Sequence, residues 1–169
     1  MSSSPSDHKA VIRHEFTRQA ATYAANPLVA DRSQLMRLVQ AVRPRPQARV
    51  LDVATGPGFV ALAFAEAGCE VVGIDLTEAP LAIAEQTRQA RGLTNVRFQL
   101  GDAEQLPFGE EAFDVVVSRF ALHHCENPQR VMAEMGRVCR SQGLVAIEDL
   151  VVSECSYAGR CGSASSNTD

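Results

Sequence analysis

A glycine-containing segment in the first half of the chain could bind an adenosine-containing ligand. The segment Val50–Gly58 reads VLDVATGPG, so an apolar run leads directly into Gly56, Pro57 and Gly58. Glycines at such a position allow a tight turn and let a ligand approach the backbone closely. Together with Ala61 they satisfy the loose dinucleotide fingerprint, so they do not choose between NAD and another adenosine ligand. A glycine turn that binds no ligand is the simpler alternative.

The charges around this loop favour a cationic ligand. Asp52 lies inside the apolar run, and Asp75 and Asp102 follow later apolar runs. No Lys or Arg lies between Arg49 and Arg88. A dinucleotide would place a pyrophosphate of charge about −2 at the N-terminus of the following helix, close to these acids. S-adenosylmethionine carries a sulfonium and an ammonium group against one carboxylate, so this net cation fits the acidic segment better.

The pattern around these acids predicts a doubly wound α/β domain. Short runs of apolar, β-branched residues alternate with helix-like stretches, which is typical of parallel strands covered by helices on both faces. The expected strands are Val50–Val53, Val71–Ile74, Val96–Leu100, Phe113–Val117 and Leu144–Ile147, and the expected helices between them are Phe59–Ala67, Thr77–Arg91 and Pro128–Arg140. Thr77 and Asn127 are expected N-caps. The carboxyl ends of parallel strands form the ligand crevice in such folds, so the three acids should meet there.

The first 49 residues differ from the rest in charge. They carry eight Lys or Arg against three Asp or Glu, which is too dilute a positive charge for a nucleic-acid footprint. Ile12, Phe16, Ala20 and Tyr23 recur with helical spacing, and a second helical stripe ends before Pro44. We therefore expect a loose tail over residues 1–7, N-terminal helices over 8–46, a ligand-binding core over 47–152 and an irregular tail over 153–169.

Length and composition exclude several classes of protein. The 169 residues suffice for one domain, and contents of 46% hydrophobic and 21% charged residues exclude a disordered chain. No apolar run reaches the ~20 residues of a membrane-spanning helix. The first ten residues lack the pattern of a signal peptide, so we expect a cytoplasmic chain. The five cysteines form no CxxC pair and are expected to be reduced thiols, with no metal site.

Three motifs resemble those of class I S-adenosylmethionine-dependent methyltransferases of the ubiquinone/menaquinone-biosynthesis type (type 11 methyltransferase domain). They are VLDVATGPG, VVGIDLTEAPLAIA and GDAEQLPFGEEAFDVVVS, and the resemblance extends over about residues 10–152. It implies a Rossmann-like, mostly parallel sheet with the strand order 3-2-1-4-5. It also implies that Asp75 accepts both ribose hydroxyls, that Asp102 meets the adenine amino group and that the Ala103 N–H reaches the ring.

The resemblance implies a wider set of cofactor-binding residues. These are Asp52, Ala54, Gly56, Gly58, Asp75, Leu76, Asp102, Ala103, Arg119 and Tyr23. Tyr23 resembles a lid residue of Phe-x-x-x-Ala-x-x-Tyr segments, with core packing as an equal alternative. The segment Arg119–His124 resembles the one beside the methionine moiety and the substrate. Packing explains His123 and His124 more simply than catalysis does, so they stay weak candidates and no catalytic residue is assigned. With Cys125 adjacent to them, they cannot easily converge on a metal ion.

The resemblance implies methyl transfer from S-adenosylmethionine to a small-molecule acceptor, such as a quinone precursor or another aromatic compound. Because the methyl donor is already activated, alignment and a dry site matter more than a general base. Family members continue with two further strands, whereas residues 153–169 are a polar Ser- and Gly-rich segment. We therefore expect a C-terminally truncated domain whose exposed fifth-strand edge invites self-association. Two alternatives remain: a non-catalytic S-adenosylmethionine-binding module and an NAD(P)-dependent oxidoreductase.

Overall fold

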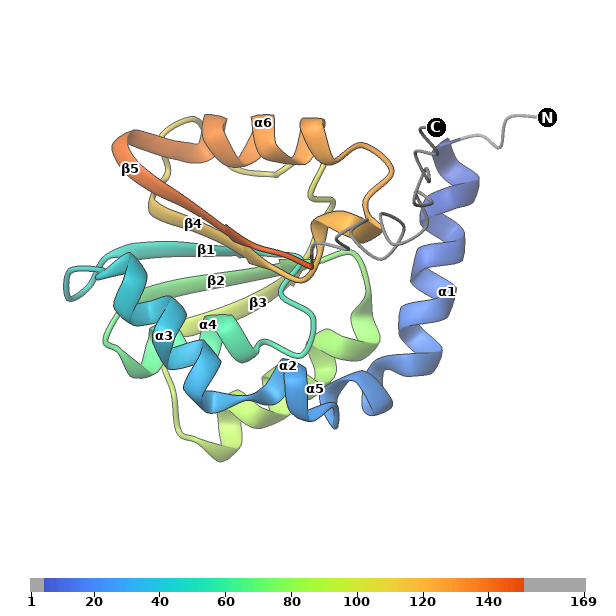
Figure 1. Cartoon of the computed structure of the whole chain (residues 1–169), viewed down its shortest axis with the longest axis horizontal. Coiled ribbons are helices and arrows are strands. Elements are labelled where there is room, and N and C mark those ends of the chain that lie inside the picture. Colours follow the sequence, from blue (N-terminus) through green and yellow to red (C-terminus); the bar gives the residue numbers. More distant parts are fainter. Residues whose placement is uncertain (1–4, 151–169) are drawn as a thin grey trace, which may run out of the picture.

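Five parallel strands form one twisted sheet in the computed structural model, which describes residues 5–150 (Figure 1). The strands are β1 (Arg49–Val53), β2 (Glu70–Asp75), β3 (Val96–Leu100), β4 (Phe113–Arg119) and β5 (Cys139–Glu148). Their order in the sheet is β3-β2-β1-β4-β5, and every neighbouring pair is parallel. The predicted α/β class, the Rossmann-like arrangement and the strand order 3-2-1-4-5 are thereby confirmed.

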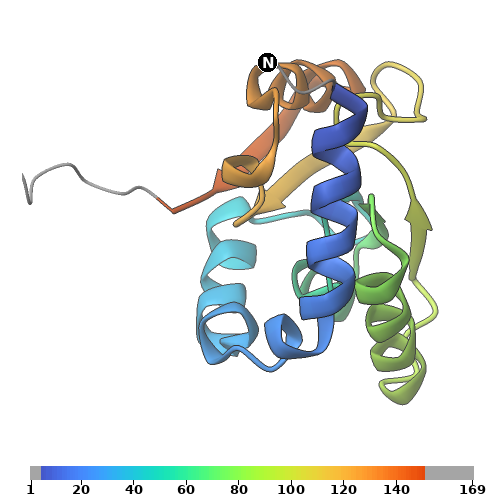
Figure 2. The same ribbon diagram turned by 90° about the vertical axis from the view of Figure 1, so that its right-hand side faces the viewer.

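Helices cover both faces of the sheet and one of its ends. They are α1 (Pro5–Ala24), α2 (Pro27–Ala30), α3 (Arg32–Val42), α4 (Phe59–Glu66), α5 (Glu78–Ala90) and α6 (Pro128–Val138), with a 3-10 turn η1 (Leu122–His124). In Figure 1, α3, α4 and α5 lie below the sheet and α6 lies above it. Figure 2 shows α1 crossing in front of the carboxyl ends of the strands. None of the described helices combines the length and the apolar character needed to cross a membrane.

The central strands β1 and β4 are buried on both faces, which explains their uninterrupted apolar sequences. Val50 and Val117 belong to the core between the sheet and the α3–α4 layer. Leu51 and Val116 belong to the core on the α6 side. Because both faces are covered, the side chains need not alternate between apolar and polar. Asp52 of β1, only 1% exposed, is a polar exception, as are the buried Ser118 and Arg119 at the end of β4.

Several predicted boundaries differ from the structure. Helix α1 begins at Pro5, inside the segment 1–7 predicted as a loose tail, because proline has a φ that suits the first helical turn. The predicted helix ending at Arg140 stops at Val138, and β5 begins at Cys139 rather than at Leu144. The register between β4 and β5 shifts near the start of β5, which disguised the strand in the sequence. The predicted tail over residues 153–169 lies outside the described residues.

The two predicted N-caps have different outcomes. The side chain of Asn127 accepts a hydrogen bond from the Arg130 amide at 2.9 Å, which confirms its capping role. Thr77 is the N-cap residue of α5, as predicted, but its side chain makes no capping hydrogen bond. Its amide donates to the Asp75 carboxylate at 3.0 Å.

Within the described residues, β5 forms one edge of the sheet and is bonded to β4 alone. Three apolar side chains of this strand are well exposed: Leu144 at 43%, Val145 at 37% and Ile147 at 42%. An edge with unpaired backbone groups and apolar side chains is a surface on which another strand can pair.

We predict that Gly58→Ala destabilises the fold more than Gly68→Ala. Both glycines have left-handed φ values, +80° and +86°. A Cβ at Gly58 would lie 2.8 Å from the Ala84 Cβ and from the Phe98 ring, whereas a Cβ at Gly68 would meet no atom within 4 Å. Gly68→Ala, the control, should therefore lower the free energy of unfolding by about 1–2 kcal/mol through backbone strain alone. Gly58→Ala should lower the free energy of unfolding by about 1–3 kcal/mol more, because the added methyl group overpacks the core. Urea unfolding measures both losses, and equal losses would contradict the prediction.

Candidate functional site

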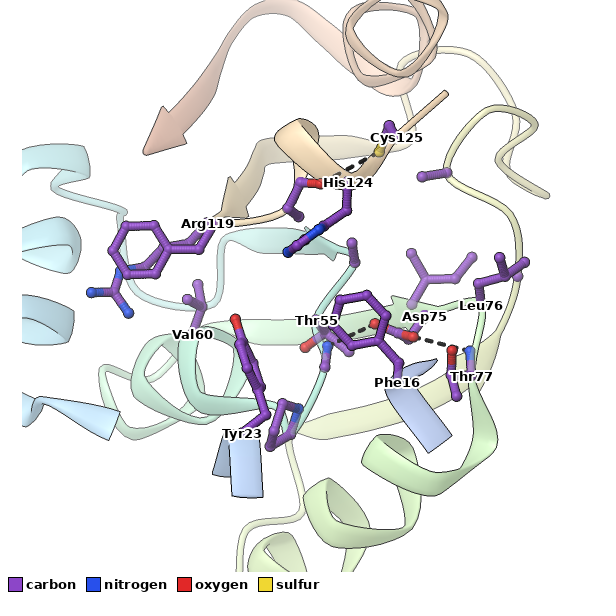
Figure 3. A pocket seen from close by; sticks show the side chains of 18 of the residues that line it. Phe16, Tyr23, Thr55, Val60, Asp75, Leu76, Thr77, Arg119, His124 and Cys125 are labelled. Carbon is purple, nitrogen blue, oxygen red and sulfur yellow. Dashed lines mark hydrogen bonds between the residues drawn. The ribbon is translucent and has the colours of Figure 1, made fainter. Parts of the chain in front are cut away.

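A pocket lies where the loops after β1, β2, β3 and β4 meet, with α1 as its outer wall (Figure 3). Helix α1 contributes Phe16 and Tyr23, and the loop after β2 contributes Asp75, Leu76 and Thr77. This is the carboxyl end of the sheet, where parallel α/β folds bind ligands. The predicted convergence of strand ends is therefore present, and residues far apart in sequence share one concave surface.

The buried Asp52 side chain fixes the loop after β1 through hydrogen bonds. Its Oδ2 accepts two hydrogen bonds, one from the Thr55 hydroxyl at 2.5 Å and one from the Ala61 amide at 3.0 Å. Ala61 lies in the first turn of α4, where a helix has unpaired N–H groups and favours negative charge. Asp52 is buried beneath the loop and is not among the residues that line the pocket, so its observed contacts are with the loop itself. Its predicted contact with a cofactor stays a prediction.

The two glycines of the loop have different roles. Gly56 has a φ of +53° and lines the pocket, with its amide donating to the Asp75 carboxylate at 2.8 Å. Gly58 does not line the pocket, and its α-carbon faces Ala84 and Phe98. This glycine allows close packing beneath the loop, and its predicted contact with a cofactor stays a prediction.

Asp75 connects the ends of two neighbouring strands. Its Oδ2 accepts from the Gly56 amide after β1, and its Oδ1 accepts from the Thr77 amide at the start of α5 (Figure 3). Burial raises the pKa of Asp75, while the hydrogen bonds from Gly56, Thr77 and Leu76 oppose that rise. Burial also raises the pKa of Asp52 to about 7, although its hydrogen bonds with Thr55 and Ala61 act in the opposite direction.

The loop after β3 brings further predicted residues to the pocket. Asp102 and Ala103 line it, and one oxygen of the Asp102 carboxylate accepts from the Glu104 amide at 2.9 Å. Of the ten residues predicted to bind a cofactor, eight line this pocket. They are Tyr23, Ala54, Gly56, Asp75, Leu76, Asp102, Ala103 and Arg119.

On the opposite side of the pocket, Arg119 joins several elements. Its Nη1 donates to the Val29 carbonyl at 3.0 Å, and its Nε lies 3.3 Å from Oε1 of Glu148. The guanidinium also stacks over the Phe120 ring, 4.1 Å from its centroid. Nearby, burial raises the pKa of Tyr23 although Arg119 opposes the rise, so the phenol keeps its proton at neutral pH. Arg119 therefore holds α2, β4 and β5 together at the wall of the pocket.

The two histidines after β4 have separate environments. His123 Nδ1 lies 2.5 Å from Oδ1 of Asp149, and the His123 amide donates to the other carboxylate oxygen at 3.1 Å. His124 lines the pocket, and its ring meets the edge of Phe16 at a centroid distance of 5.1 Å. Within residues 5–150, no group of three or more His, Cys, Asp or Glu side chains is placed to hold a metal ion.

Some residues of the site were missed in the sequence. Thr55, Val29 and Asp149 reach the site or its supports, but the sequence analysis assigned no role to any of them, although Thr55 lies within the first motif. A signal for Thr55 existed, since a hydroxyl three residues after a buried acid in a loop can satisfy that acid. No comparable signal existed for Asp149, because its contact depends on the register of β5.

Comparisons with known proteins agree with this geometry. A family model described as a methyltransferase domain matches residues 51–147. The methyltransferase YcgJ of Bacillus subtilis, itself uncharacterised, is 34% identical over 134 residues, which are 79% of this chain and 53% of that protein. The demethylmenaquinone methyltransferase of Thermus thermophilus is 39% identical over 122 residues, covering 70% of this chain and 55% of that protein.

Solved structures give the same result for the fold. The crystal structure of YcgJ superposes with a TM-score of 0.67 at 31% identity, covering 73% of this chain and 53% of that chain. The [4+2]-cyclase SpnF superposes with a TM-score of 0.63 at 30% identity, covering 67% of this chain and 43% of that chain. The chain thus spans about half the length of these relatives. SpnF is a cyclase, so this fold is compatible with more than one reaction. The reaction must therefore be argued from the site and not from the fold.

We predict that the contribution of Asp52 to the stability of the protein falls as the pH rises from about 5 to 7, because this carboxyl ionises in the folded chain. The pKa of this carboxyl rises from 3.8 to about 7 on burial, so the folded chain keeps a proton that the unfolded chain has lost. The resulting stabilisation is complete below about pH 4 and disappears as the pH passes the folded pKa. Asp52→Asn removes this dependence. The difference in unfolding free energy, wild type minus variant, should fall by about 1 kcal/mol per pH unit.

Urea unfolding of both proteins at several pH values measures this difference. An amide at position 52 alters the hydrogen bonds to Thr55 and Ala61, which shifts the stability of the variant by an amount that does not depend on pH. The test therefore compares the slopes of unfolding free energy against pH in the two proteins. Equal slopes for wild type and Asp52→Asn would contradict the prediction.

Proposed function

The chain belongs to the methyltransferase domain family, whose cofactor is S-adenosylmethionine, and from this premise we propose that it transfers the sulfonium methyl group to a small-molecule acceptor. The observation that carries the proposal is the position of Asp75. This carboxylate lies in the pocket between the loop after β1 and the start of α5, where both of its oxygens bind backbone amides. A neighbouring strand end supplies Asp102 to the same pocket.

The residues of the pocket suit the groups of the cofactor. In this proposal Asp75 accepts hydrogen bonds from the ribose hydroxyls, and Asp102 accepts one from the adenine amino group. The Ala103 amide donates to the adenine ring, since a main-chain N–H is a donor and a carboxylate is an acceptor. Gly56 leaves the loop open for the close approach of the methionine part. Tyr23 and Phe16 of α1 cover the cofactor from outside.

The charge of the pocket supports a cationic cofactor over a dinucleotide. The Gly56 amide already donates to the Asp75 side chain, so an acidic group lies where a pyrophosphate would seek N–H donors. Among the described residues that line the pocket, Arg119 is the single Lys or Arg side chain. Its Nη1 donates to the Val29 carbonyl, its Nε lies 3.3 Å from the Glu148 carboxylate and its plane covers the Phe120 ring, while Nη2 has no hydrogen-bond partner among the described residues. This arrangement disfavours the alternative of an NAD(P)-dependent oxidoreductase.

The protein contributes alignment and exclusion of water to the proposed reaction. When bound, the cofactor supplies an electrophilic methyl group, which needs an acceptor atom in line with the breaking S–C bond. The rings of Phe16, Tyr23 and Phe120 form apolar walls beside the cofactor residues. Walls of this kind hold a planar acceptor and keep water from competing for the methyl group.

An aromatic acceptor of the quinone-precursor type fits these walls. The proposal is supported by the demethylmenaquinone methyltransferases of Thermus thermophilus and Geobacillus kaustophilus, which are 39% and 41% identical to the chain over the matched residues. The three aromatic side chains from α1 and from the loop after β4 offer faces on which a flat ring can stack.

We also propose that two copies of the chain associate through the β5 edge. The proposal is supported by the exposed Leu144, Val145 and Ile147 and by the outer edge of β5, which pairs with no other strand in the described part of the chain. Sedimentation velocity should show a dimer that Val145→Lys returns to the monomer. A monomeric wild type at high concentration would contradict it.

Asp75→Ala should weaken the binding of S-adenosylmethionine by about 1.5–3 kcal/mol, the range for hydrogen bonds to a charged group. Glu70→Ala is the matched control, because Glu70 is exposed at the opposite end of the same strand. Calorimetric titration measures both affinities, and unfolding experiments at the same pH verify that the variants are folded. Unchanged affinity in Asp75→Ala would remove Asp75 from the cofactor site.

A labelled-methyl assay then separates transfer from binding alone. Incorporation of label into a phenolic or quinol acceptor supports the proposed function. Cofactor binding without transfer to any acceptor would favour the alternative of a non-catalytic binding module.

A further inference from the structure

We propose that His124 is the general base of the reaction, positioned by His123 and Asp149, and that the acceptor carries a weakly acidic hydroxyl on an aromatic or conjugated ring. This inference rests on the proposed methyl transfer and specifies its acceptor side. It assigns a role to the segment after β4 and to the end of β5, which cofactor binding leaves unexplained.

The His123 side chain is fixed by a carboxylate from a different strand. Asp149 directly follows β5, and its two oxygens bind the ring Nδ1 and the backbone amide of His123. The same carboxylate accepts from the Leu150 amide at 2.7 Å. Burial acts to raise the pKa of Asp149, but the bonds from Leu150 and His123 hold it below its ordinary value, so the group is ionised at neutral pH. An ionised carboxylate therefore anchors the 3-10 turn η1.

The neighbouring ring of His124 faces the pocket. It packs against the His123 ring at a centroid distance of 3.9 Å and against the edge of Phe16 at 5.1 Å. Figure 3 shows it directed into the pocket from the β4 side, above Thr55 and opposite the rings carried by α1. Two ring contacts from different elements thus fix a basic side chain at the place where an acceptor would lie next to the cofactor residues.

The electrostatic surroundings keep His124 unprotonated at neutral pH. Burial is the main cause that lowers its pKa, and the adjacent His123 lowers it further, while the Asp149 charge opposes both. From α1 the ring is met by the uncharged Phe16. Other ionisable groups of this pocket, apart from the cofactor carboxylates, are Tyr23, Glu104, Arg119, Cys125 and Glu126. A neutral imidazole in a partly enclosed site can accept a proton during the reaction.

The proposed step balances with the groups already named. The acceptor O–H bond breaks as its proton moves to the free ring nitrogen of His124. The oxygen electron pair forms a bond to the methyl carbon, and the S–CH₃ pair returns to sulfur. The sulfonium becomes a neutral thioether and His124 becomes an imidazolium. The Asp149 carboxylate stabilises that new positive charge, consistent with its effect on the His124 pKa.

A phenolic acceptor suits both an imidazole base and the aromatic walls of the pocket. A phenolic hydroxyl has a pKa of about 10, so an imidazole can take its proton while the methyl group is being transferred. The aromatic rings of Phe16, Tyr23 and Phe120 around the pocket also suit a flat, conjugated acceptor.

The test uses the full chain and its His124→Gln, Asp149→Asn and His14→Gln variants. His14 is exposed on α1 and does not line the pocket, so it is the matched histidine control. Calorimetry first measures S-adenosylmethionine binding by each protein. Rates of labelled-methyl transfer are then measured with catechol, unsubstituted phenol and 4-nitrophenol, which differ in acidity, over a range of pH.

We expect all four proteins to bind S-adenosylmethionine with the same affinity. His124→Gln should lower kcat by about 10²–10⁴-fold with phenol and catechol, the usual contribution of a general base. The loss should be much smaller with 4-nitrophenol, because that acceptor ionises without help. In Asp149→Asn the acid limb of the kcat profile should move to lower pH, since removal of the carboxylate charge lowers the pKa of His124. A purely structural role of Asp149 would not move this limb.

Three results would overturn the inference. One is a wild-type protein that binds the cofactor but methylates none of the phenols. Another is His124→Gln with the kcat of His14→Gln on every acceptor. The third is a loss in His124→Gln that is equal for weakly and strongly acidic phenols. Failure of the wild type to bind S-adenosylmethionine would instead contradict the proposed function itself, so the two failures are distinguishable.

Discussion

The hydrogen bond from the Gly56 amide to the Asp75 carboxylate is the interaction on which the site depends. It joins the loop after β1 to the end of β2, and it is possible because the two strands pair in parallel with Val53 opposite Ile74. Below it, Asp52 fixes the same loop through Thr55 and the first turn of α4. Two buried carboxylates thus determine the shape of the loop, and they make its surroundings acidic before any ligand is bound.

The site has two halves that come from different parts of the fold. The ends of β1, β2 and β3 supply acids and backbone amides, which suit an adenosyl group. The end of β4 supplies Arg119 and the two histidines, and residues following or ending β5 hold them in place through Glu148 and Asp149. Helix α1 spans both halves with Phe16 and Tyr23. A methyl donor and an acceptor would therefore meet beneath one helix, between an acidic surface and an aromatic one.

The sequence predicted the fold and much of the site because both follow from local rules. Buried parallel strands have continuous apolar runs, and their carboxyl ends meet, so Asp75 and Asp102 could be placed together. The sequence did not show that the Asp52 side chain is buried beneath the loop and binds Thr55 and Ala61, because a one-dimensional pattern does not show which side of a loop a side chain faces. Asp149 could not be predicted, since its contact with His123 requires the shifted register between β4 and β5.

An amide NMR titration tests the central claim most directly, because it reports on the loop and on both neighbouring strand ends at once. The account predicts that S-adenosylmethionine shifts the amide signals of Gly56, Leu76 and Ala103 saturably and with one common affinity, and that NADH leaves them unchanged. Equal responses to the two compounds, or shifts confined to residues outside the pocket, would contradict it.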